Sequence, residues 1–185
     1  MVKYNKKNLK KIRIESFHKH HPRIRAEDWR SPLVRRLSNN DVYKDGKRVL
    51  TNSFRSNLME VQIHDLILTW SGLKEDFDRC IKTYQLPVIT EFATLGLCCI
   101  LLTNNLGLEI TEVTRRSEKA DYWLGDKEEL IEISGQLCGS LSHLCNVKSI
   151  QLLSNPYRKS GYVCVANYVD AKSRLWYYHF DERTP

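Results

Sequence analysis

The chain has 185 residues, of which 42% are hydrophobic and 28% charged, a balance typical of a soluble globular protein. This length fits one domain, or one domain with an arm, and is enough to bury a real core. No uninterrupted apolar run approaches the length of a membrane span, and the first residues lack the apolar core of a signal peptide. Six cysteines without zinc-type spacing favour a reducing compartment, so we expect a cytoplasmic protein without a membrane partner.

Charge is unevenly distributed along the chain. Residues 1–56 contain 16 Lys and Arg against 5 Asp and Glu, a net charge of +11, and because the whole chain carries +7, residues 57–185 carry −4. We therefore divide the chain into a basic N-terminal arm, residues 1–56, and a body, residues 57–185. Such an arm attracts phosphates whatever the base sequence, and docking on an acidic partner protein is the alternative. The candidates for nucleic-acid contact are Arg23, Arg25, Arg35, Arg36, Lys47 and Arg48 in the arm, and Arg158 and Lys159 in a later basic loop.

The first predicted elements lie on either side of this boundary. Within the arm, weak periodicity and turn residues predict irregular structure, with one short helix over 32–37 that Ser31 would cap. Just after the boundary, apolar and polar residues alternate with period two up to Trp70, and the phase of the alternation changes near Asp65. This pattern predicts two short strands, or one long strand with a bulge.

The rest of the body alternates between helical and strand patterns. A short amphipathic helix is predicted at 73–85 and an apolar, buried helix at 90–102. Strands are predicted at 108–114, 120–124 and 130–134, a long helix entered through Gly135 at 136–153, and two strands at 162–169 and 175–180. From residue 88 onward, this order predicts an α/β fold in which a mixed sheet is flanked by helices.

Two acidic residues occupy neighbouring strands of this sheet. Asp121 lies early in its strand and Glu132 in the next, and the hairpin between them can bring the two carboxylates together. Converging carboxylates beside a backbone carbonyl suit an octahedral Mg²⁺, which can activate a water and neutralise phosphate charge. Because acidic residues beside hairpins are also common on surfaces, the pair by itself leaves a metal site and an ordinary surface pair both open.

Two helices each add one charged residue to this pair. Lys148 extends the apolar stripe of Leu137, Leu141 and Leu144 on the last helix, so its side chain points toward the sheet. Such a lysine is paired or functional, or else it extends its amine to the solvent at the rim. Glu91 shares a face with apolar residues of the 90–102 helix, where it needs a partner or simply favours the helix start.

The order of elements and acidic residues resembles the core of the PD-(D/E)xK nuclease superfamily, the restriction-endonuclease-like fold, over roughly residues 88–180. By this resemblance Asp121 takes the place of the family's Asp, Glu132 that of the (D/E), and Glu91 that of the accessory acid on the first core helix. The family's lysine normally follows the second acid by two residues, where this chain has Ser134. Some branches carry the lysine on the following helix instead.

Lys148 is suitably placed for such a migrated lysine, and the family's proline position is taken by Ala120, which carries no chemistry. The resemblance implies a metal-dependent nuclease that hydrolyses phosphodiester bonds of nucleic acid, with DNA as the expected substrate. Asp121, Glu132 and the Ile133 carbonyl would hold Mg²⁺ or Mn²⁺, and Lys148 would orient the attacking water or stabilise phosphate charge.

The family also implies a setting for such a protein. Small nucleases of this kind often serve bacterial genome defence, such as antiviral defence, or mobile-element systems as one subunit of a larger assembly, so we expect other protein subunits as partners. The alternative is a catalytically inactive nuclease-fold subunit that binds nucleic acid or scaffolds a complex, which Ser134 favours. A structural protein whose basic arm binds an acidic protein is a third possibility.

Overall fold

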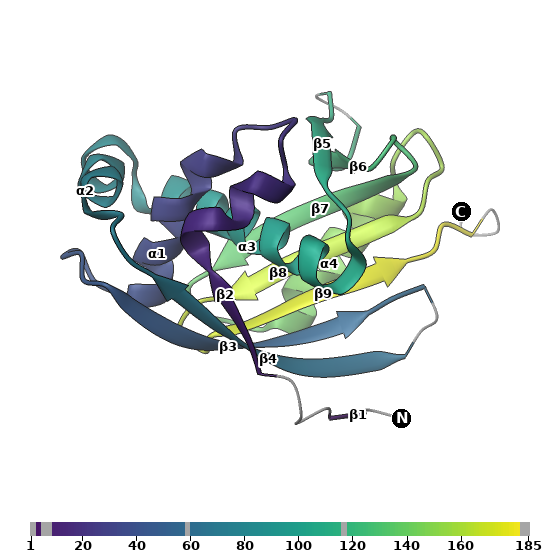
Figure 1. Cartoon of the computed structure of the whole chain (residues 1–185). Helices are drawn as coiled ribbons and strands as arrows, with labels where there is room; N and C mark the ends of the chain where they lie inside the picture. The colour runs from purple at the N-terminus through teal and green to yellow at the C-terminus, as the bar shows by residue number, and fades with distance from the viewer. Residues whose placement is uncertain (1–2, 5–8, 58–59, 116–117, 182–185) are drawn as a thin grey trace.

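The computed structural model describes residues 3–4, 9–57, 60–115 and 118–181. These residues form one mixed sheet of nine strands with helices packed against it (Figure 1). The strands are β1 (Lys3–Tyr4), β2 (Lys10–Arg13), β3 (Gly46–Arg55), β4 (Val61–Trp70), β5 (Ile110–Val113), β6 (Tyr122–Leu124), β7 (Glu129–Gln136), β8 (Gly161–Asn167) and β9 (Lys172–Tyr178). They lie in the order β1-β4-β3-β9-β8-β7-β6-β5, and β2 also pairs with β4. The predicted α/β class with a mixed sheet is therefore confirmed.

The helices cover the two faces of this sheet unequally. The 3₁₀ helices are η1 (Ile14–His20) and η2 (Ala26–Trp29), and the α-helices are α1 (Arg30–Ser38), α2 (Lys74–Thr83), α3 (Leu86–Leu106) and α4 (Leu141–Leu153). Along β7, Ile131 and Ile133 belong to the large core cluster that contains α3, whereas Leu130 belongs to a smaller cluster that contains α4. Because side chains alternate across a strand, α3 and α4 pack on opposite faces, which we name the α3 face and the α4 face. Figure 1 shows α1, α2 and α3 gathered on one side of the sheet.

The central helix α3 is apolar all round because it is enclosed. It begins after Gln85 and ends at Gly107, whose φ of 68° allows the left-handed turn that terminates the helix. By length and composition alone α3 is long and apolar enough to cross a membrane, but 67% of its most apolar window is buried inside the fold. It packs against α1, β7 and β8.

The prediction of an irregular arm is wrong for residues 9–55; residues 1–2 and 5–8 lie outside the described part of the chain. Both β2 and β3 belong to the sheet, and η1, η2 and α1 pack against α3. Ile14, Leu33 and Leu50 are fully buried in the same core cluster as α3. The apolar residues of this segment are widely separated by charged ones, so they give only a weak periodic pattern in the sequence. They form a buried face in the structure because they pack against α3.

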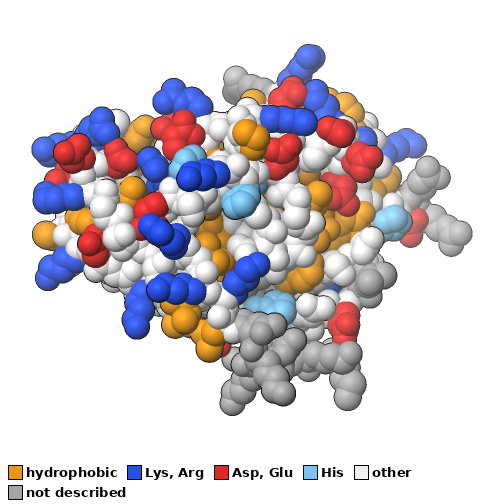
Figure 2. Space-filling view, in the orientation of Figure 1, with side chains coloured by type: hydrophobic (Ala, Val, Ile, Leu, Met, Phe, Trp, Pro, Cys, Tyr) orange, Lys and Arg blue, Asp and Glu red, His pale blue; other side chains and the backbone are white. Residues whose placement is uncertain are grey.

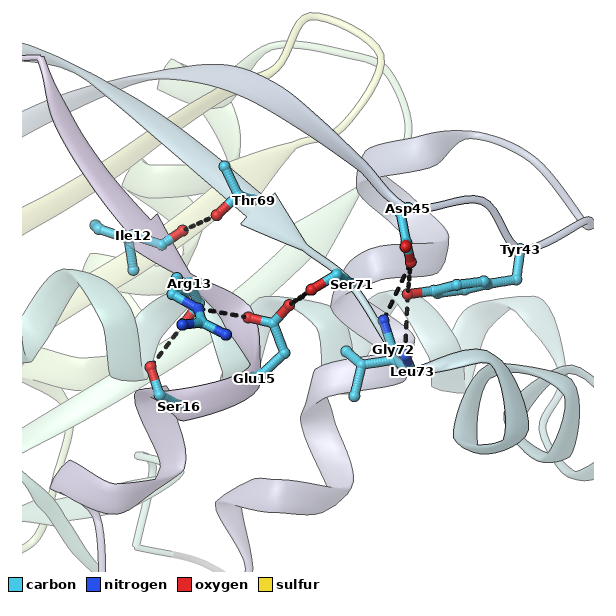
Figure 3. A network of polar contacts seen from close by, with 10 residues as sticks. All are labelled: Ile12, Arg13, Glu15, Ser16, Tyr43, Asp45, Thr69, Ser71, Gly72 and Leu73. Carbon is cyan, nitrogen blue, oxygen red and sulfur yellow. Dashed lines mark hydrogen bonds and ion pairs between the residues drawn. The ribbon is translucent and has the colours of Figure 1, made fainter.

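Polar contacts also tie this N-terminal segment to the turn between β4 and α2 (Figure 3). The Glu15 carboxylate accepts hydrogen bonds from the backbone N–H and, at 3.0 Å, from the hydroxyl of Ser71. The Asp45 carboxylate accepts from the Gly72 N–H at 3.1 Å and from the Tyr43 hydroxyl at 2.7 Å. The turn's donors are therefore satisfied by residues far away in the sequence, and the two predicted parts of the chain share one fold.

Strand β4 is one continuous strand without the predicted bulge. It pairs residue for residue with β3, from Gly46 opposite Trp70 to Arg55 opposite Val61. The phase of the alternation changes because the apolar side chains move from one face of the strand to the other along its length. Leu66, Leu68 and Trp70 are buried on the α3 face, whereas Ile63 lies half-buried on the α4 face.

Three helices begin at least two residues away from where the sequence predicts. Helix α3 starts at Leu86 rather than at 90. Helix α4 starts at Leu141 rather than at 136, because β7 continues to Gln136 in register with β8. Gly135 is consequently a strand residue, and its lack of a side chain is required: a Cβ there would lie 2.0 Å from the Thr94 Oγ1 atom of α3. The predicted 32–37 helix is α1, which starts earlier, with Trp29 rather than Ser31 at its N-cap.

Candidate active site at the ends of β6 and β7

The centre of the candidate site is a carboxylate that is completely enclosed. Glu132 lies in the middle of β7, faces α4 and has no exposed surface. Its Oε1 atom accepts a hydrogen bond from the Nζ of Lys148 on α4 at 2.5 Å, and the same ammonium donates to Gln151 Oε1 at 3.1 Å. The other carboxylate oxygen of Glu132, Oε2, is buried and has no hydrogen-bond partner among the described residues. Lys148 thus reaches the sheet as the sequence predicts.

Asp121 holds β7 on both sides of Glu132. It directly precedes β6, and its backbone N–H donates to the Ile131 carbonyl at 3.0 Å. Its Oδ2 atom accepts from the backbone N–H of Ile133 at 2.7 Å. Because the N–H and C=O of a strand residue point to the same side of the strand, the Ile133 carbonyl faces the side on which Asp121 lies. The structure therefore gathers Asp121, Glu132 and the Ile133 backbone at one place.

The two carboxyl groups influence each other electrostatically. Burial, followed by repulsion from Asp121, raises the pKa of Glu132 to about 7, although the hydrogen bond from Lys148 acts in the opposite direction. Burial also raises the pKa of Asp121, and the charge of Glu91 adds to this rise, whereas the N–H of Ile133 and the charge of Lys148 oppose it. Both carboxyl groups are thus harder to ionise than usual. A cation bound between them would favour their ionised forms.

A cavity of about 450 Å³ opens beside these groups, between the start of α3 and the ends of β6 and β7. Asp121, Lys148, Ser134 and Glu91 all line it. The sequence places Glu91 on a buried face, but the structure leaves its side chain exposed at the cavity, one turn before the buried Leu95. The neighbouring Ile89 and Thr90 are buried, so Glu91 lies on the side of α3 that faces the cavity.

The donor set can hold a divalent cation, although it is small. Within the described residues, no group of three or more His, Cys, Asp and Glu side chains is placed to bind a metal. Two carboxylates, one of them with an unpartnered buried oxygen, and a nearby carbonyl nevertheless fit the all-oxygen coordination of Mg²⁺ or Mn²⁺. Asp121, Glu132 and the Ile133 carbonyl are the groups that fit a cation here.

Three of the arginines predicted to contact nucleic acid have structural partners instead. Arg35 and Arg36 are buried; Arg35 pairs with Asp41 at 2.5 Å, and Arg36 donates to the Leu86 carbonyl at 2.5 Å. Arg48 donates to three carbonyl oxygens, those of Leu37, Tyr168 and Val169, at 2.9 to 3.3 Å. Because their guanidinium groups join segments of the fold, these three side chains do not offer a free surface to phosphates.

The other predicted contacts lie nearer the solvent and do not form one patch. Arg23 pairs with Glu109 and Asp126 at 3.4 and 3.5 Å, and Arg25 pairs with Asp28 at 3.3 Å. Lys47 and Arg158 are exposed, and Lys159 donates to the Lys127 carbonyl at 2.7 Å. Figure 2 shows positive and negative side chains interspersed over the visible face. The excess charge of residues 1–56 is therefore distributed over the fold rather than carried on a separate arm.

Sequence reasoning missed Gln151 as a member of the site. It lies three residues after Lys148, a spacing that places both side chains on the same face of a helix, and that spacing could have identified it. A scan against protein-family models finds no match for the chain, and searches of curated proteins and of solved structures find none either. The function is therefore inferred from the geometry around Glu132.

Proposed function

We propose that the protein is a metal-dependent nuclease that hydrolyses phosphodiester bonds of DNA. One observation carries this proposal: a fully buried glutamate whose first oxygen binds Lys148 and whose second oxygen is unpartnered, close to a second raised-pKa carboxyl group. A buried, half-satisfied carboxylate is unfavourable for stability alone. Groups of this kind concentrate at functional sites.

In this proposal each residue has a distinct role. Asp121 and Glu132 hold Mg²⁺ or Mn²⁺, with the Ile133 carbonyl as a further ligand. When bound, such an ion supplies an activated water and neutralises charge on the phosphate. The Lys148 ammonium binds Glu132 in the free protein and stabilises negative charge on the reacting phosphate, and Glu91 at the cavity acts as an accessory acid. The fixed hydrogen bond from Ile133 to Asp121 keeps that carboxylate oriented.

The restriction-endonuclease-like fold is part of the same proposal. The order α3, β5, β6, β7, α4, β8 supports it, with the acids on and beside β6 and β7 and the lysine on α4. Ser134 occupies the usual lysine position and lines the cavity, while Lys148 reaches the same carboxylate from α4. This arrangement supports the idea that the lysine's role has moved to the helix. The expected setting is cytoplasmic, in a bacterial genome-defence or mobile-element system with other protein subunits.

One observation favours a second candidate function, a catalytically inactive subunit that binds nucleic acid or scaffolds a complex. Lys148 already neutralises Glu132 at 2.5 Å, and no third acidic side chain joins the two carboxylates among the described residues. An ion pair of this kind can persist as a remnant of a site that no longer binds metal.

A cleavage assay separates the two candidates. Supercoiled plasmid and single-stranded DNA are incubated with the protein in Mg²⁺, in Mn²⁺ and in EDTA, and the wild type is compared with Glu132→Gln and Asp121→Asn. We expect metal-dependent cleavage that falls at least about 100-fold in both variants. Glu128→Gln is the matched control, because Glu128 is an exposed acid in the same hairpin, and it should cleave like wild type.

Two outcomes contradict the nuclease proposal. Cleavage that survives in Glu132→Gln, or that persists in EDTA, would show that the activity does not depend on this site. If the wild type cleaves neither substrate in either metal but binds DNA in a salt-sensitive way, the inactive binding subunit is the better description.

A further inference from the structure

Part of the α4 face lies beyond α4 and has no helix over it in the described part of the chain. The register of the strands shows which residues lie side by side on this face. Val165 of β8 lies opposite Arg174 of β9, and Arg174 lies opposite Ser53 of β3. Ser53 in turn lies opposite Ile63 of β4. Paired residues share a face, so this surface is continuous with the face that carries Glu132. Helix α4 packs on β7, β8 and β9, and the α4-face side chains of β3 and β4 are half-buried or exposed. We call this surface, formed by β2, β4, β3 and β9, the open face.

The open face is strongly basic. Within the described strands that form it, six cationic side chains point to this face, together with one acidic side chain, Asp65, whose carboxylate accepts a hydrogen bond from the Thr51 hydroxyl at 2.7 Å. The cations are Lys11, Arg13, Lys47, Arg55, Lys172 and Arg174. Only Lys47 belongs to the contacts predicted from the sequence. These six cations come from β2, β3 and β9, which are far apart in the chain, so the linear order of residues does not reveal this basic surface.

A groove of about 460 Å³ lies where the open face meets the start of α4. Lys172 and Arg174 line it together with Thr51, Ser53, Ser140 and Ser142, and Ser173, also in the lining, donates its hydroxyl to Asn52. Arg174 donates to the Ser142 hydroxyl at 2.9 Å, which fixes its guanidinium at the wall of the groove. Asp170, also in the lining, is held by the amide of Asn167 at 3.1 Å. Cations and hydroxyl groups are the side chains that bind phosphate oxygens.

The aromatic residues at the other end of the open face are already covered. The Arg55 guanidinium lies 4.4 Å from the ring centre of Trp176 and 4.8 Å from that of Tyr178, and Arg174 lies 4.5 Å from that of Trp176. Because guanidinium groups cover these rings, bases cannot stack on them as they do in single-strand binding proteins. The surface therefore offers contacts to the nucleic-acid backbone and few to the bases.

We propose that the open face binds the phosphodiester backbone of DNA without regard to base sequence. This inference rests on the proposed function and locates its substrate on the same face of the sheet as Glu132. From Lys47 to Arg55 the face extends about 27 Å along β3 at about 3.4 Å per residue. That length matches about eight nucleotides of one strand.

The test compares two triple variants of the full chain that lose the same charge. The open-face variant is Lys47→Gln, Lys172→Gln and Arg174→Gln. The control variant is Lys19→Gln, Lys74→Gln and Lys82→Gln, in which three exposed cations of η1 and α2 are removed. Binding to fluorescein-labelled 16-nucleotide single strands and 16-base-pair duplexes of mixed sequence is measured by anisotropy in EDTA at several salt concentrations, and thermal unfolding checks that both variants are folded.

We expect the open-face variant to bind at least tenfold more weakly and the control less than twofold more weakly. The logarithm of the binding constant decreases linearly with the logarithm of the salt concentration. In the open-face variant this slope should become less steep by up to about 3, about one unit for each lost phosphate contact. Equal weakening of both variants, or unchanged binding by the open-face variant, overturns the proposal. The proposal is also overturned if the wild type binds polyglutamate but not DNA. It is likewise overturned if the open face is buried in a dimer of this chain that the three substitutions dissociate.

The result is independent of catalysis. Binding is measured in EDTA, without the metal that the proposed cleavage requires, so it does not depend on turnover. If the open-face variant loses binding while the wild type never cleaves, the backbone-binding surface stands and the nuclease proposal fails. If the wild type cleaves and the open-face variant both binds and cleaves normally, the nuclease proposal stands and this one fails.

Discussion

The two faces of the sheet differ in what their residues accomplish. On the α3 face, α1, α3 and the 3₁₀ helices bury a continuous apolar cluster that includes Leu68, Leu101 and Tyr162. On the α4 face one short helix covers only part of the sheet, over a much smaller apolar cluster. The buried Glu132, its partner Lys148 and the open face all lie on this less covered side. Most of the apolar core therefore lies on one face of the sheet, whereas Glu132, Lys148 and the open face lie on the other.

This division has a physical reason. A face that is sealed by apolar helices tolerates charge poorly, because each buried ion loses its hydration. A face that is covered at its centre and open at its sides can hold a desolvated carboxylate next to solvent-accessible cations.

Leu101→Ala tests the α3 face. Leu101 is fully buried in α3, so the substitution removes apolar contacts and leaves a cavity, and the free energy of unfolding should fall by about 2–5 kcal/mol. Urea unfolding followed by circular dichroism measures this loss. Ile150→Ala on the exposed side of α4, where the side chain is 71% exposed, should change it by less than about 0.5 kcal/mol. Similar losses in the two variants would remove the contrast between sealed and open surfaces.

Lys148→Met tests the ion pair of the α4 face. It leaves Glu132 buried and without its partner, and because Lys148 is partly exposed we expect a loss of about 2 kcal/mol at pH 8. The additional substitution Glu132→Gln should restore most of the lost stability, because the unpaired charge disappears. Urea unfolding of the single and double variants measures the coupling. A double variant no more stable than Lys148→Met would show that the pair does not act as a unit.

The pH dependence of Glu132 provides a second test of this pair. Its folded pKa, about 7, lies above the ordinary value of 4.5, so the folded protein binds the proton more tightly than the unfolded chain does. Its contribution to stability is therefore fully present below about pH 4.5 and is lost as the pH rises toward 7. Stability curves of wild type and Glu132→Gln should converge at low pH and diverge over this window. Parallel curves would contradict the raised pKa.

His21 should give the opposite pH dependence on the α3 face. This buried ring accepts a hydrogen bond from the Ile110 N–H at Nδ1, at 3.0 Å, so its proton lies on Nε2, which donates toward the Cys99 carbonyl and the Thr103 hydroxyl at 3.1 Å. Burial lowers the pKa of His21 below 6.5. Protonation would place a second donor against the Ile110 N–H. Stability from this group is thus present above pH 6.5 and is lost as the pH falls below it.

The substitution His21→Gln measures that contribution. We expect about 1–2 kcal/mol of lost stability at pH 8, from the lost buried hydrogen bonds, and a weaker decline of stability between pH 6.5 and 5 than in wild type. His20→Gln, at an exposed neighbouring position, should leave the stability at pH 8 unchanged and should change the acid decline less than His21→Gln does, because the charge of His20 is only a minor cause of the lowered pKa of His21. If His21→Gln declines in acid as steeply as wild type, another group is responsible for the acid sensitivity.

Ser140→Ala should have the smallest effect. The Ser140 hydroxyl caps α4 by accepting from the His143 N–H at 3.2 Å, and its removal should lower stability by about 0.5–1 kcal/mol. Ser142→Ala, one helical position inside α4, is the comparison and should cost less, because its hydroxyl makes no cap. Differential scanning calorimetry of both variants measures the difference. An equal loss in both would assign the effect to the groove rather than to the cap.

Much of the fold could be predicted from local patterns, and so could part of the candidate site. The apolar sequence of α3 and the alternation in β7 are strong signals, because each element buries a whole face. Lys148 was identified because it continues an apolar stripe, and its contact with Glu132 follows once α4 lies on β7. The exposed position of Glu91 could not be predicted, because it depends on where the cavity beside β6 and β7 opens against α3.

The N-terminal segment shows what sequence alone cannot supply. Its apolar residues, such as Ile14 and Leu33, are too widely spaced to give a clear period, and its charges dominate the composition. Only the packing of η1 and α1 on α3 makes those residues a core and gives Arg35 and Arg48 internal partners.

By itself the sequence determined the local elements, the central apolar helix and the acids and lysine of the candidate site, because these depend on the spacing of neighbouring residues. The tertiary structure decided that residues 9–55 belong to the sheet, that α4 begins after β7 ends, and that cations from three strands form one surface. Such features arise from pairing between residues far apart in the chain, and strand register, unlike helical periodicity, leaves no mark in any short stretch of sequence.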